Sequence, residues 1–374
     1  MRPLRVAAKL IACALFLTLP SCSRQESLPV PTGYPSSYSD IIRRAIDGKS
    51  LLIWSTVDRA TAAGLMAAFH RRYPDIRVTY EKMETAVLYD RFRADAFARK
   101  PAPDFLWSSA MDLQIKLVND GFAQTYLSPE RGKLPDWANW KDQAWGTTAE
   151  PIIFAYNKKL VAEAHLPQGH IALTHLLESK PSWLDGKIGA YDINRSGAGY
   201  LFLSQDEQAT HDIWRTVRAM GANHTRTYLH SEAMLDDLAA GKLAIAYDVI
   251  GSYALEAKEQ NPEIGIVLPK DFTLVMSRIA IIPAKAPHSD AARLFLDFLL
   301  SRAGQQYLAK ADTPSVRPDV AIPQGLRPVN VPMRAIRVSP ALLVDRDQLT
   351  RRYTLKRWNE AISPSQAQPG DEAE

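Results

Sequence analysis

Small hydroxyl side chains follow several apolar, strand-like segments of this sequence, at the points where those segments end. In a parallel sheet such ends lie together beside helix N-termini, whose unpaired N–H groups and positive dipole favour anions. Hydroxyl groups add hydrogen bonds to such a site without adding charge. The pattern predicts a binding site for a small, negatively charged molecule. Its members are Ser55, Thr56, Thr85, Ser108, Ser109, Ser196, Gly197, Ser252 and Tyr253.

Each of these residues also has a purely structural interpretation. Serine and threonine are preferred N-cap residues of any helix, and Ser109 with Asp112 has the spacing of a capping box. Their recurrence after successive strands favours binding over capping. The glycines that follow Ser196 strengthen that position, because glycine lets a bound group approach the backbone closely. Their spacing matches neither the dinucleotide-binding motif nor the P-loop, so nucleotide binding is not predicted.

Motifs for catalysis are missing from the sequence. It contains no G-x-S-x-G and no H-E-x-x-H motif, and no cysteine is left free to act as a nucleophile. His165, His170 and His175 recur every five residues, which does not place them on one face of a helix as metal ligands. We therefore expect no enzyme, no metal site and no cofactor.

The N-terminus has the features of a secretory signal. Three basic residues precede an apolar run over residues 10–19, which is too short to span a bilayer of about 30 Å as a helix. The tetrapeptide Leu19-Pro20-Ser21-Cys22 resembles the bacterial lipobox. We predict a lipoprotein signal peptide over residues 1–21, with Cys22 lipidated and anchoring the protein in the periplasm or cell envelope. An ordinary signal peptide cut nearby is the alternative.

Composition narrows the class of protein. Removal of residues 1–21 takes away three basic residues, so the net charge falls from +4 to +1. A nearly neutral chain argues against a nucleic-acid partner. With 46% hydrophobic residues the chain can bury a large core, and a mature length of about 350 residues suggests two domains.

Strand-like and helix-like patterns alternate along the chain, which predicts an α/β fold with parallel strands. Before them, a Ser- and Pro-rich stretch predicts a flexible tether that, with the lipidated Cys22, covers residues 22–48. Strands are predicted at 51–54, 76–80, 105–107, 151–156, 187–190, 243–247, 264–268 and 279–282. Helices are predicted after Asp58, from Thr85, from Ser109, over 289–308 and over 345–360, and six prolines make 313–340 mostly extended.

Five segments carry a family resemblance: TYEKMETAVLYDRF, APDFLWSS, GTTAEPIIFAYNKKL, WLDGKIGAYDINRSGAGY and DAARLFLDFLLSRAGQQYL, in this order. The sequence resembles the solute-binding proteins of ABC importers over residues 49–310. Within them it is most similar to the type 2 periplasmic-binding-protein fold of ferric-ion, hexose-phosphate, phosphoglycerate and phosphonate binders.

The resemblance implies two lobes that close on a ligand, joined by two hinge crossovers near Gly146–Ala155 and Leu268–Ile282. Lobe one is expected to hold residues 49–148 and 271–310, and lobe two residues 155–268. Residues 311–374 form a C-terminal extension.

The residues at the implied cleft bear on the ligand. Ferric-ion members present two adjacent tyrosines, whereas here Ser252 precedes Tyr253, and one phenolate is a poor cage for Fe³⁺. Arg278, on the returning crossover, is a candidate partner for an anionic group, with a hinge salt bridge as the alternative. Arg195, beside Ser196, is a second candidate.

The resemblance thus implies a monomeric, cofactor-free protein that captures a small anionic organic solute, of the phosphorylated sugar, phosphoglycerate or phosphonate type. It would deliver the solute to an ABC permease. Two alternatives stay open: a sensor that signals to a membrane histidine kinase, and a ferric-ion binder.

Overall fold

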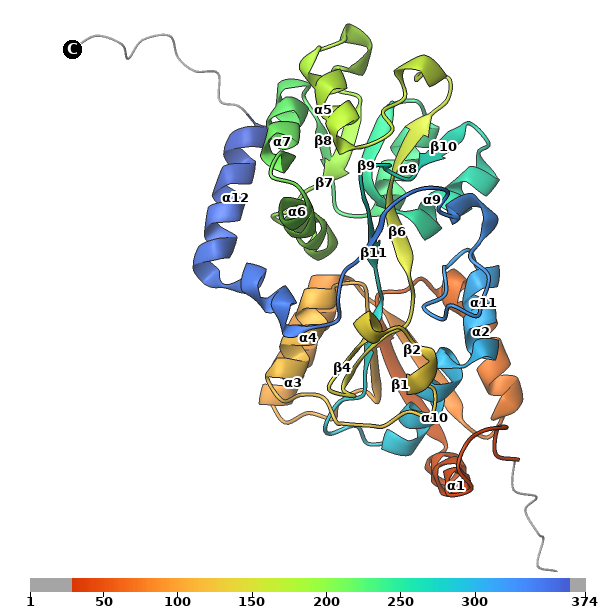
Figure 1. The fold of residues 1–374 in the computed structure, drawn as a ribbon. Helices are drawn as coiled ribbons and strands as arrows, with labels where there is room; N and C mark the ends of the chain where they lie inside the picture. The colour runs from red at the N-terminus through yellow and green to blue at the C-terminus, as the bar shows by residue number, and fades with distance from the viewer. Residues whose placement is uncertain (1–28, 364–374) are drawn as a thin grey trace, which may run out of the picture.

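The computed structural model describes residues 29–363, which form two α/β lobes, one above the other in Figure 1. The predicted fold class is confirmed. The chain crosses from lobe one to lobe two between β5 and β6 and returns between β11 and β12. Cys22 and the predicted signal peptide lie outside the described residues. Among those residues, no helix combines the length and the apolar character that a membrane span needs.

Lobe one is built on a six-stranded sheet in the order β2-β1-β3-β12-β5-β4, in which β1 pairs in parallel with β2 and β3. Its strands are β1 (Ser50–Ser55), β2 (Arg77–Lys82), β3 (Phe105–Ser108), β4 (Asn139–Trp140), β5 (Ala144–Gly146) and β12 (Ile279–Ile281). Its helices are α1 (Tyr38–Gly48), α2 (Arg59–Arg72), α3 (Thr85–Phe97), α4 (Met111–Asn119), α10 (Ser289–Leu300) and α11 (Arg302–Lys310).

Lobe two contains a seven-stranded sheet in the order β13-β11-β6-β9-β7-β8, with β10 also paired to β6. Its strands are β6 (Glu150–Asn157), β7 (Ile188–Tyr191), β8 (Arg226–Tyr228), β9 (Ile245–Ile250), β10 (Ile264–Val267), β11 (Thr273–Met276) and β13 (Met333–Ala335). Its helices are α5 (His170–Glu178), α6 (Gly197–Ala209), α7 (Ile213–Ala222), α8 (Ser231–Ala239), α9 (Gly251–Gln260) and α12 (Gln348–Ile362). Short 3-10 helices occupy Arg131–Lys133, Asp136–Ala138, Glu163–His165, Ser182–Leu184, Gln324–Leu326 and Pro340–Arg346.

Burial explains why the strands read as apolar runs. All eight residues of β6 but one are buried, as are all six of β9, because helices cover both faces of this sheet. In lobe one, the ring of Phe295 meets the edges of Phe69 and Phe105 at centroid distances of 5.2 and 5.0 Å. This aromatic cluster packs α2 and α10 against the sheet. The strand ends that face the cleft belong to the same sheet.

The N-terminal tether is shorter than predicted. Tyr38, Ile42 and Ala45 form a buried stripe on α1, which packs against α10, and the Tyr38 hydroxyl donates to Asp297 Oδ2 at 2.8 Å. Their i, i+4, i+7 spacing is the helical signature that the preceding Ser- and Pro-rich composition obscures. Lobe one therefore begins before residue 49.

Two helix predictions differ in detail from the structure. The helix predicted over 289–308 is divided at Ser301, whose extended backbone ends α10 and whose Oγ accepts from the Gly304 N–H at 3.1 Å to begin α11. A Cβ on Gly304 would lie 2.0 Å from the Phe298 carbonyl, so glycine is required at this break. The capping box at Ser109 does not form, because α4 begins after Ala110 and Asp112 pairs with Arg346.

The C-terminal extension connects the two lobes. Its strand β13 pairs in parallel with β11 of lobe two, and Arg317 pairs with Glu130 of lobe one. Helix α12, blue in Figure 1, packs against α7 of lobe two. Just before it, Asp345 accepts from Gln208 of α6 at 3.0 Å while Arg346 donates to Asp112 of α4 at 2.7 Å. Two adjacent residues of the extension thus form contacts with different lobes.

Trp358 is the buried anchor of α12, only 3% exposed, and belongs to the core of lobe two. Its replacement by alanine removes a large buried aromatic, so we expect Trp358→Ala to lower the free energy of unfolding by about 3 kcal/mol in urea denaturation. Tyr353→Ala, on the same helix but 64% exposed, is the control and is expected to change stability little. Equal effects of the two changes would mean that α12 is not anchored by this contact.

Candidate functional site

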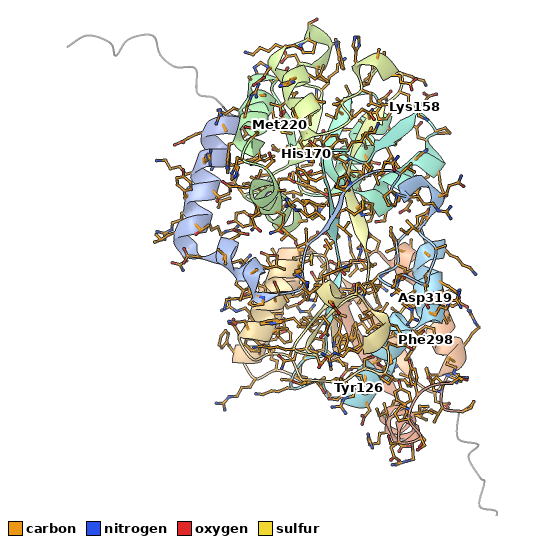
Figure 2. All side chains as sticks on the ribbon, viewed as in Figure 1. Tyr126, Lys158, His170, Met220, Phe298 and Asp319 are labelled. Atoms are coloured by element: carbon orange, nitrogen blue, oxygen red, sulfur yellow. The ribbon has the colours of Figure 1, made fainter. Side chains whose placement is uncertain are left out.

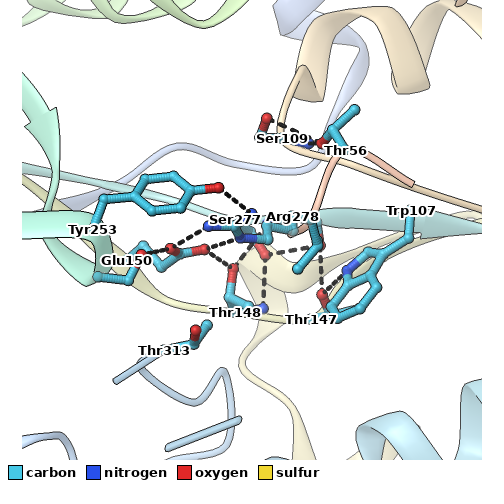
Figure 3. A network of polar contacts seen from close by, with 12 residues as sticks. Thr56, Trp107, Ser109, Thr147, Thr148, Glu150, Tyr253, Ser277, Arg278 and Thr313 are labelled. Atoms are coloured by element: carbon cyan, nitrogen blue, oxygen red, sulfur yellow. Dashed lines mark hydrogen bonds and ion pairs between the residues drawn. The ribbon is translucent and has the colours of Figure 1, made fainter. Parts of the chain in front are cut away.

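An ion pair lies where the two crossovers meet. It joins Glu150, at the start of β6, to Arg278, between β11 and β12 (Figure 3), and both residues are fully buried. Arg278 Nε and Nη2 donate to the two oxygens of Glu150 at 2.7 and 3.0 Å, which is a bidentate pair. Arg278 Nη1 donates to the Tyr253 hydroxyl at 3.2 Å. The guanidinium is therefore occupied from both sides.

Threonine side chains bind the two crossover segments to each other. Thr147 Oγ1 donates to the Arg278 carbonyl at 2.7 Å and accepts from the Trp107 indole N–H at 2.8 Å. Thr148 Oγ1 accepts from the Arg278 backbone N–H at 2.9 Å and donates to Glu150 at 2.8 Å. The buried polar groups of this network have partners, which is the condition under which an interior ion pair is tolerated.

The pair remains charged at neutral pH. Burial alone would raise the pKa of Glu150, but the Arg278 guanidinium and hydrogen bonds from Arg278, Ser252 and Thr148 hold that pKa below its ordinary value. Because it is paired in this way, Arg278 cannot give a bidentate contact to a solute without giving up Glu150.

A cleft opens between the lobes beside this pair. It has a free volume of about 90 Å³ and is lined by residues of both lobes at or next to helix N-termini. Thr85 begins α3, Ser196 caps α6 through a bond from the Gly199 N–H at 3.2 Å, and Ser231 begins α8. Tyr253 lies in the first turn of α9. Several positive helix ends therefore converge on one small space.

The structure brings together part of the predicted binding set. Thr56, Thr85, Ser109, Ser196 and Tyr253 line the cleft. In lobe one, Thr56 Oγ1 accepts from the Ser109 N–H at 3.0 Å, which holds the two loops together.

Other members of the set lie beside the cleft or below it. Gly197 touches Thr85 across the lobes, where a Cβ would lie 3.4 Å from Thr85 Oγ1. Ser55 and Ser108 are buried within lobe one and bind backbone groups of that lobe, with Ser55 Oγ donating to the Trp107 carbonyl at 3.0 Å and Ser108 Oγ accepting from the Ala110 N–H at 3.2 Å. The Ser252 hydroxyl donates to Glu150. Like Arg278, these three residues do not line the cleft but lie behind residues that do.

Charged lining residues were not in the predicted set. They are Lys82, Glu84, His230 and Glu232, and the hydroxyl of Ser231 accompanies them. Ser231 follows strand β8 and begins a helix, so the rule that found Ser196 applies to it as well. The sequence 226–228 is only three residues long and two of them are exposed, which is why no strand was predicted there. The charged residues carry no comparable sequence pattern.

Ion pairs cross and line the cleft. Lys82 Nζ lies 3.2 Å from Asp58 and 3.8 Å from Glu84, and His230 Nδ1 of lobe two lies 3.4 Å from Glu84 of lobe one. The Tyr253 hydroxyl donates to Asp58 at 3.2 Å, again between lobes. The lobes therefore touch across the cleft in this structure.

One of the lining carboxyls, Glu232, has a raised pKa. Burial, and then the neighbouring Asp58, raise the pKa of Glu232. Burial would also raise the pKa of Asp58, but hydrogen bonds from Glu232 and Lys82 and the charge of Lys82 keep it lowered. The two carboxyl groups therefore shift in opposite directions, with Glu232 the one that holds its proton more tightly.

Known proteins resemble this chain in sequence and in fold. The family model for bacterial extracellular solute-binding proteins matches residues 64–324. The substrate-binding protein of an ABC transporter from Agrobacterium tumefaciens is 38% identical, with a TM-score of 0.79, covering 84% of this chain and 95% of that chain. No curated protein sequence matches this chain significantly.

More distant structures share the fold. The periplasmic binding protein AfuA from Actinobacillus pleuropneumoniae, with fructose-6-phosphate bound, is 20% identical with a TM-score of 0.67 and covers 85% of this chain and 100% of that chain. Iron-bound HitA from Pseudomonas aeruginosa is also 20% identical with a TM-score of 0.67, covering 82% of this chain and 98% of that chain.

The buried pair at the crossover generates a prediction. Glu150→Gln leaves the Arg278 charge without its partner, so we expect the free energy of unfolding at pH 7 to fall by about 3 kcal/mol in urea denaturation. Because the folded-state pKa of Glu150 is depressed, its contribution is complete above its unfolded pKa of about 4.3 and is lost as the pH falls through the folded value. The difference between wild type and variant is therefore expected to be constant above about pH 4.3 and to shrink as the pH falls below it.

Glu263→Gln is the matched control. Its partner Lys159 is 71% exposed and 3.8 Å away, and exposed pairs of this kind contribute little to stability. If both variants were equally stable, the Glu150–Arg278 pair would not hold the crossovers together.

Proposed function

The chain belongs to the bacterial extracellular solute-binding protein family, and from this premise we propose which solute it captures. Proteins of this family are transport proteins rather than enzymes, they act outside the cytoplasm, and they deliver small solutes to ABC permeases. We propose that this member closes its lobes on a small anionic organic solute of the phosphorylated sugar, phosphoglycerate or phosphonate type.

The convergence of helix N-termini and hydroxyls on the cleft carries this proposal. The N-terminal turns of α3, α6 and α8 contribute Thr85, Ser196 and Ser231, and Thr56 and Ser109 add hydroxyls from lobe one. Helix N-termini with adjacent hydroxyls supply several donors to one anionic group. Lys82 provides a cation at the same place. The small size of the cleft suits a small solute.

The acidic lining residues favour a solute that also carries hydroxyl groups. Glu84 and Glu232 lie at the cleft beside the anion-binding helix ends. A carboxylate accepts hydrogen bonds from a sugar or glycerate hydroxyl, and a protonated carboxyl also donates one. These residues would disfavour a bare, highly charged anion, because like charges repel. The helix N-termini and the acidic residues of the lining together therefore favour an anionic solute that also carries hydroxyl groups.

The same residues form a poorer binding site for ferric iron. Tyr253 is the only tyrosine of the cleft that also contacts a buried guanidinium, since Arg278 donates to its hydroxyl at 3.2 Å. The same hydroxyl donates to Asp58 at 3.2 Å, so binding of Fe³⁺ by the phenolate would require the loss of both hydrogen bonds and of the phenolic proton. These contacts support the organic anion over the ferric alternative.

We further propose that Cys22 carries the lipid that holds the protein at a bacterial membrane. Val30 and Tyr34 already pack against the core of lobe one. Only the short segment between Cys22 and Val30 would then separate the membrane from the folded protein. The anchor would keep lobe one near the membrane surface, where a permease is located.

A ligand screen tests the proposed solute class. We expect phosphorylated sugars, phosphoglycerates or phosphonates to raise the melting temperature, because a ligand present at 100 times its dissociation constant stabilises the folded state by about 2.7 kcal/mol. Differential scanning fluorimetry measures the shift. A response to Fe³⁺ alone, with a visible charge-transfer band, would sink the organic-anion proposal while leaving the solute-binding family intact.

Two capping serines provide a matched pair for the binding site. Ser196 caps α6 at the cleft and Ser301 caps α11 outside it, and each accepts from the N–H three residues on, at 3.2 and 3.1 Å. Both alanine variants are expected to lose about 1 kcal/mol of stability. Only Ser196→Ala is expected to weaken binding of the solute that the screen identifies, by about tenfold in isothermal titration calorimetry. Equal affinities would remove Ser196 from the site.

The proposed anchor is tested on the full-length chain expressed in a bacterial host. Wild-type protein is expected in the membrane fraction, with a mass increase from acylation of Cys22 in its N-terminal peptide. Cys22→Ser is expected to abolish that modification and to release the processed protein, or to leave the signal uncleaved. Unmodified Cys22 in the wild-type peptide would refute lipidation.

A further inference from the structure

A second cluster of potential ligands lies inside lobe two and takes no part in the cleft. It consists of His170 at the start of α5, Asp206 in α6 and Asp248 in β9. One donor atom from each lies within 4.8 Å of the others, and the residues are only 4%, 0% and 5% exposed. Figure 2 labels His170 among the elements of this lobe. The three residues come from parts of the chain that are far apart in sequence.

The imidazole of His170 is held in one orientation. Its Nδ1 lies 2.9 Å from Asp271 Oδ1, and the Phe272 ring stacks on it at 4.1 Å with an angle of 5°. If Nδ1 carries the proton that Asp271 accepts, Nε2 presents a lone pair. That Nε2 faces Asp206 Oδ1 at 4.0 Å. In that tautomer, two hydrogen-bond acceptors face each other.

The carboxylate of Asp206 is only half satisfied. Its Oδ2 accepts from the Tyr247 hydroxyl at 2.6 Å, while its Oδ1 is buried and has no hydrogen-bond partner. A buried polar atom without a partner is costly, so such an atom in a folded protein points to an unseen ligand. Asp206 Oδ1 is directed at the space that His170 and Asp248 share.

The cluster has an excess of negative charge. Asp206, Asp248 and Asp271 surround a single imidazole, and within residues 29–363 no lysine or arginine forms an ion pair with Asp206 or Asp248. Asp248 also holds a left-handed backbone with φ 58°, a strained conformation for an aspartate. Buried carboxylates are normally paired or bind a cation.

We propose that His170, Asp206 and Asp248 bind a divalent transition-metal ion of the Zn²⁺ type. One imidazole nitrogen and two carboxylate oxygens are a ligand set that suits Zn²⁺. Bonds of about 2.0–2.2 Å place such donors about 3.3 Å apart. The His170–Asp206 separation of 4.0 Å must then close by less than 1 Å, and no donor pair of the cluster is more than 4.8 Å apart. Asp271 and Tyr247 then act as outer partners that orient His170 and Asp206.

The site would be structural rather than part of solute capture. The ion would join α5, α6 and β9, which lie on different parts of the lobe-two sheet. It would also relieve the unpartnered Asp206 oxygen. The proposal does not depend on the identity of the solute, because none of the three ligands lines the cleft.

A shared proton is the competing explanation. Burial raises the pKa of both Asp206 and Asp248, and a carboxyl–carboxylate pair could hold one proton between them. The two explanations differ in their response to metal and to amide substitution, since an Asn side chain replaces a protonated carboxyl well and a metal-binding carboxylate poorly.

The test uses the tag-free, chelator-treated protein. Zn²⁺ titration by calorimetry is expected to show one tight ion per chain, with a rise in melting temperature, and elemental analysis of protein purified without chelator is expected to show bound metal. Asp248→Asn is expected to abolish the tight site. Asp271→Asn, which removes only the outer partner, is expected to weaken binding about 10- to 100-fold.

His288→Gln is the matched control. His288 also pairs with a buried carboxylate, Asp104, at 3.1 Å, but it lies in lobe one and outside the cluster. Its Zn²⁺ binding is expected to equal that of the wild type. Absence of stoichiometric Zn²⁺ binding by the wild-type chain would overturn the proposal, whether or not the Asn variants fold. The shared proton would be favoured instead if the Asp248→Asn variant were as stable as the wild type and its stability did not change when Zn²⁺ was added.

Discussion

The buried ion pair between Glu150 and Arg278 is the constraint on which the rest of the structure depends. It lies where the two crossover segments between the sheets run side by side. Threonine hydroxyls on one segment complete the network on the other. Because the guanidinium is committed to Glu150, recognition of an anion must come from elsewhere. In the proposed site, the helix N-termini of both lobes and Lys82 would take that role.

The C-terminal extension limits how the lobes can move about this hinge. Asp345 is held by α6 of lobe two and Arg346 by α4 of lobe one, on the same side of the molecule as α12. Opening the cleft must either break these contacts or move the extension along with one lobe. It must also break the contacts between the lobes that Glu84 makes with His230 and that Asp58 makes with Tyr253. The extension therefore contributes to the balance between closed and open lobes, in addition to the solute.

The sequence by itself determined the alternation of elements and hence the α/β fold class. Apolar runs such as residues 151–156 are buried in continuous strands because helices cover both sheet faces, so burial and pattern coincide. The hydroxyl rule selected Thr56, Thr85, Ser109, Ser196 and Tyr253, and all five line one cleft in the structure. Ser55 and Ser108, selected by the same rule, turn inward instead, because the orientation of a hydroxyl depends on the local turn.

Only the tertiary structure decided which charges face one another. The partner of Arg278 is 128 residues away in sequence, and no local pattern marks Glu150 as that partner. The spacing of His170 from its neighbouring histidines gave no reason to expect a metal site, because Asp206 and Asp248 reach it from a helix and a strand elsewhere in lobe two. Local periodicity specifies which face of an element is buried. Electrostatic pairing between distant elements is fixed only when the sheets assemble and bring those faces together.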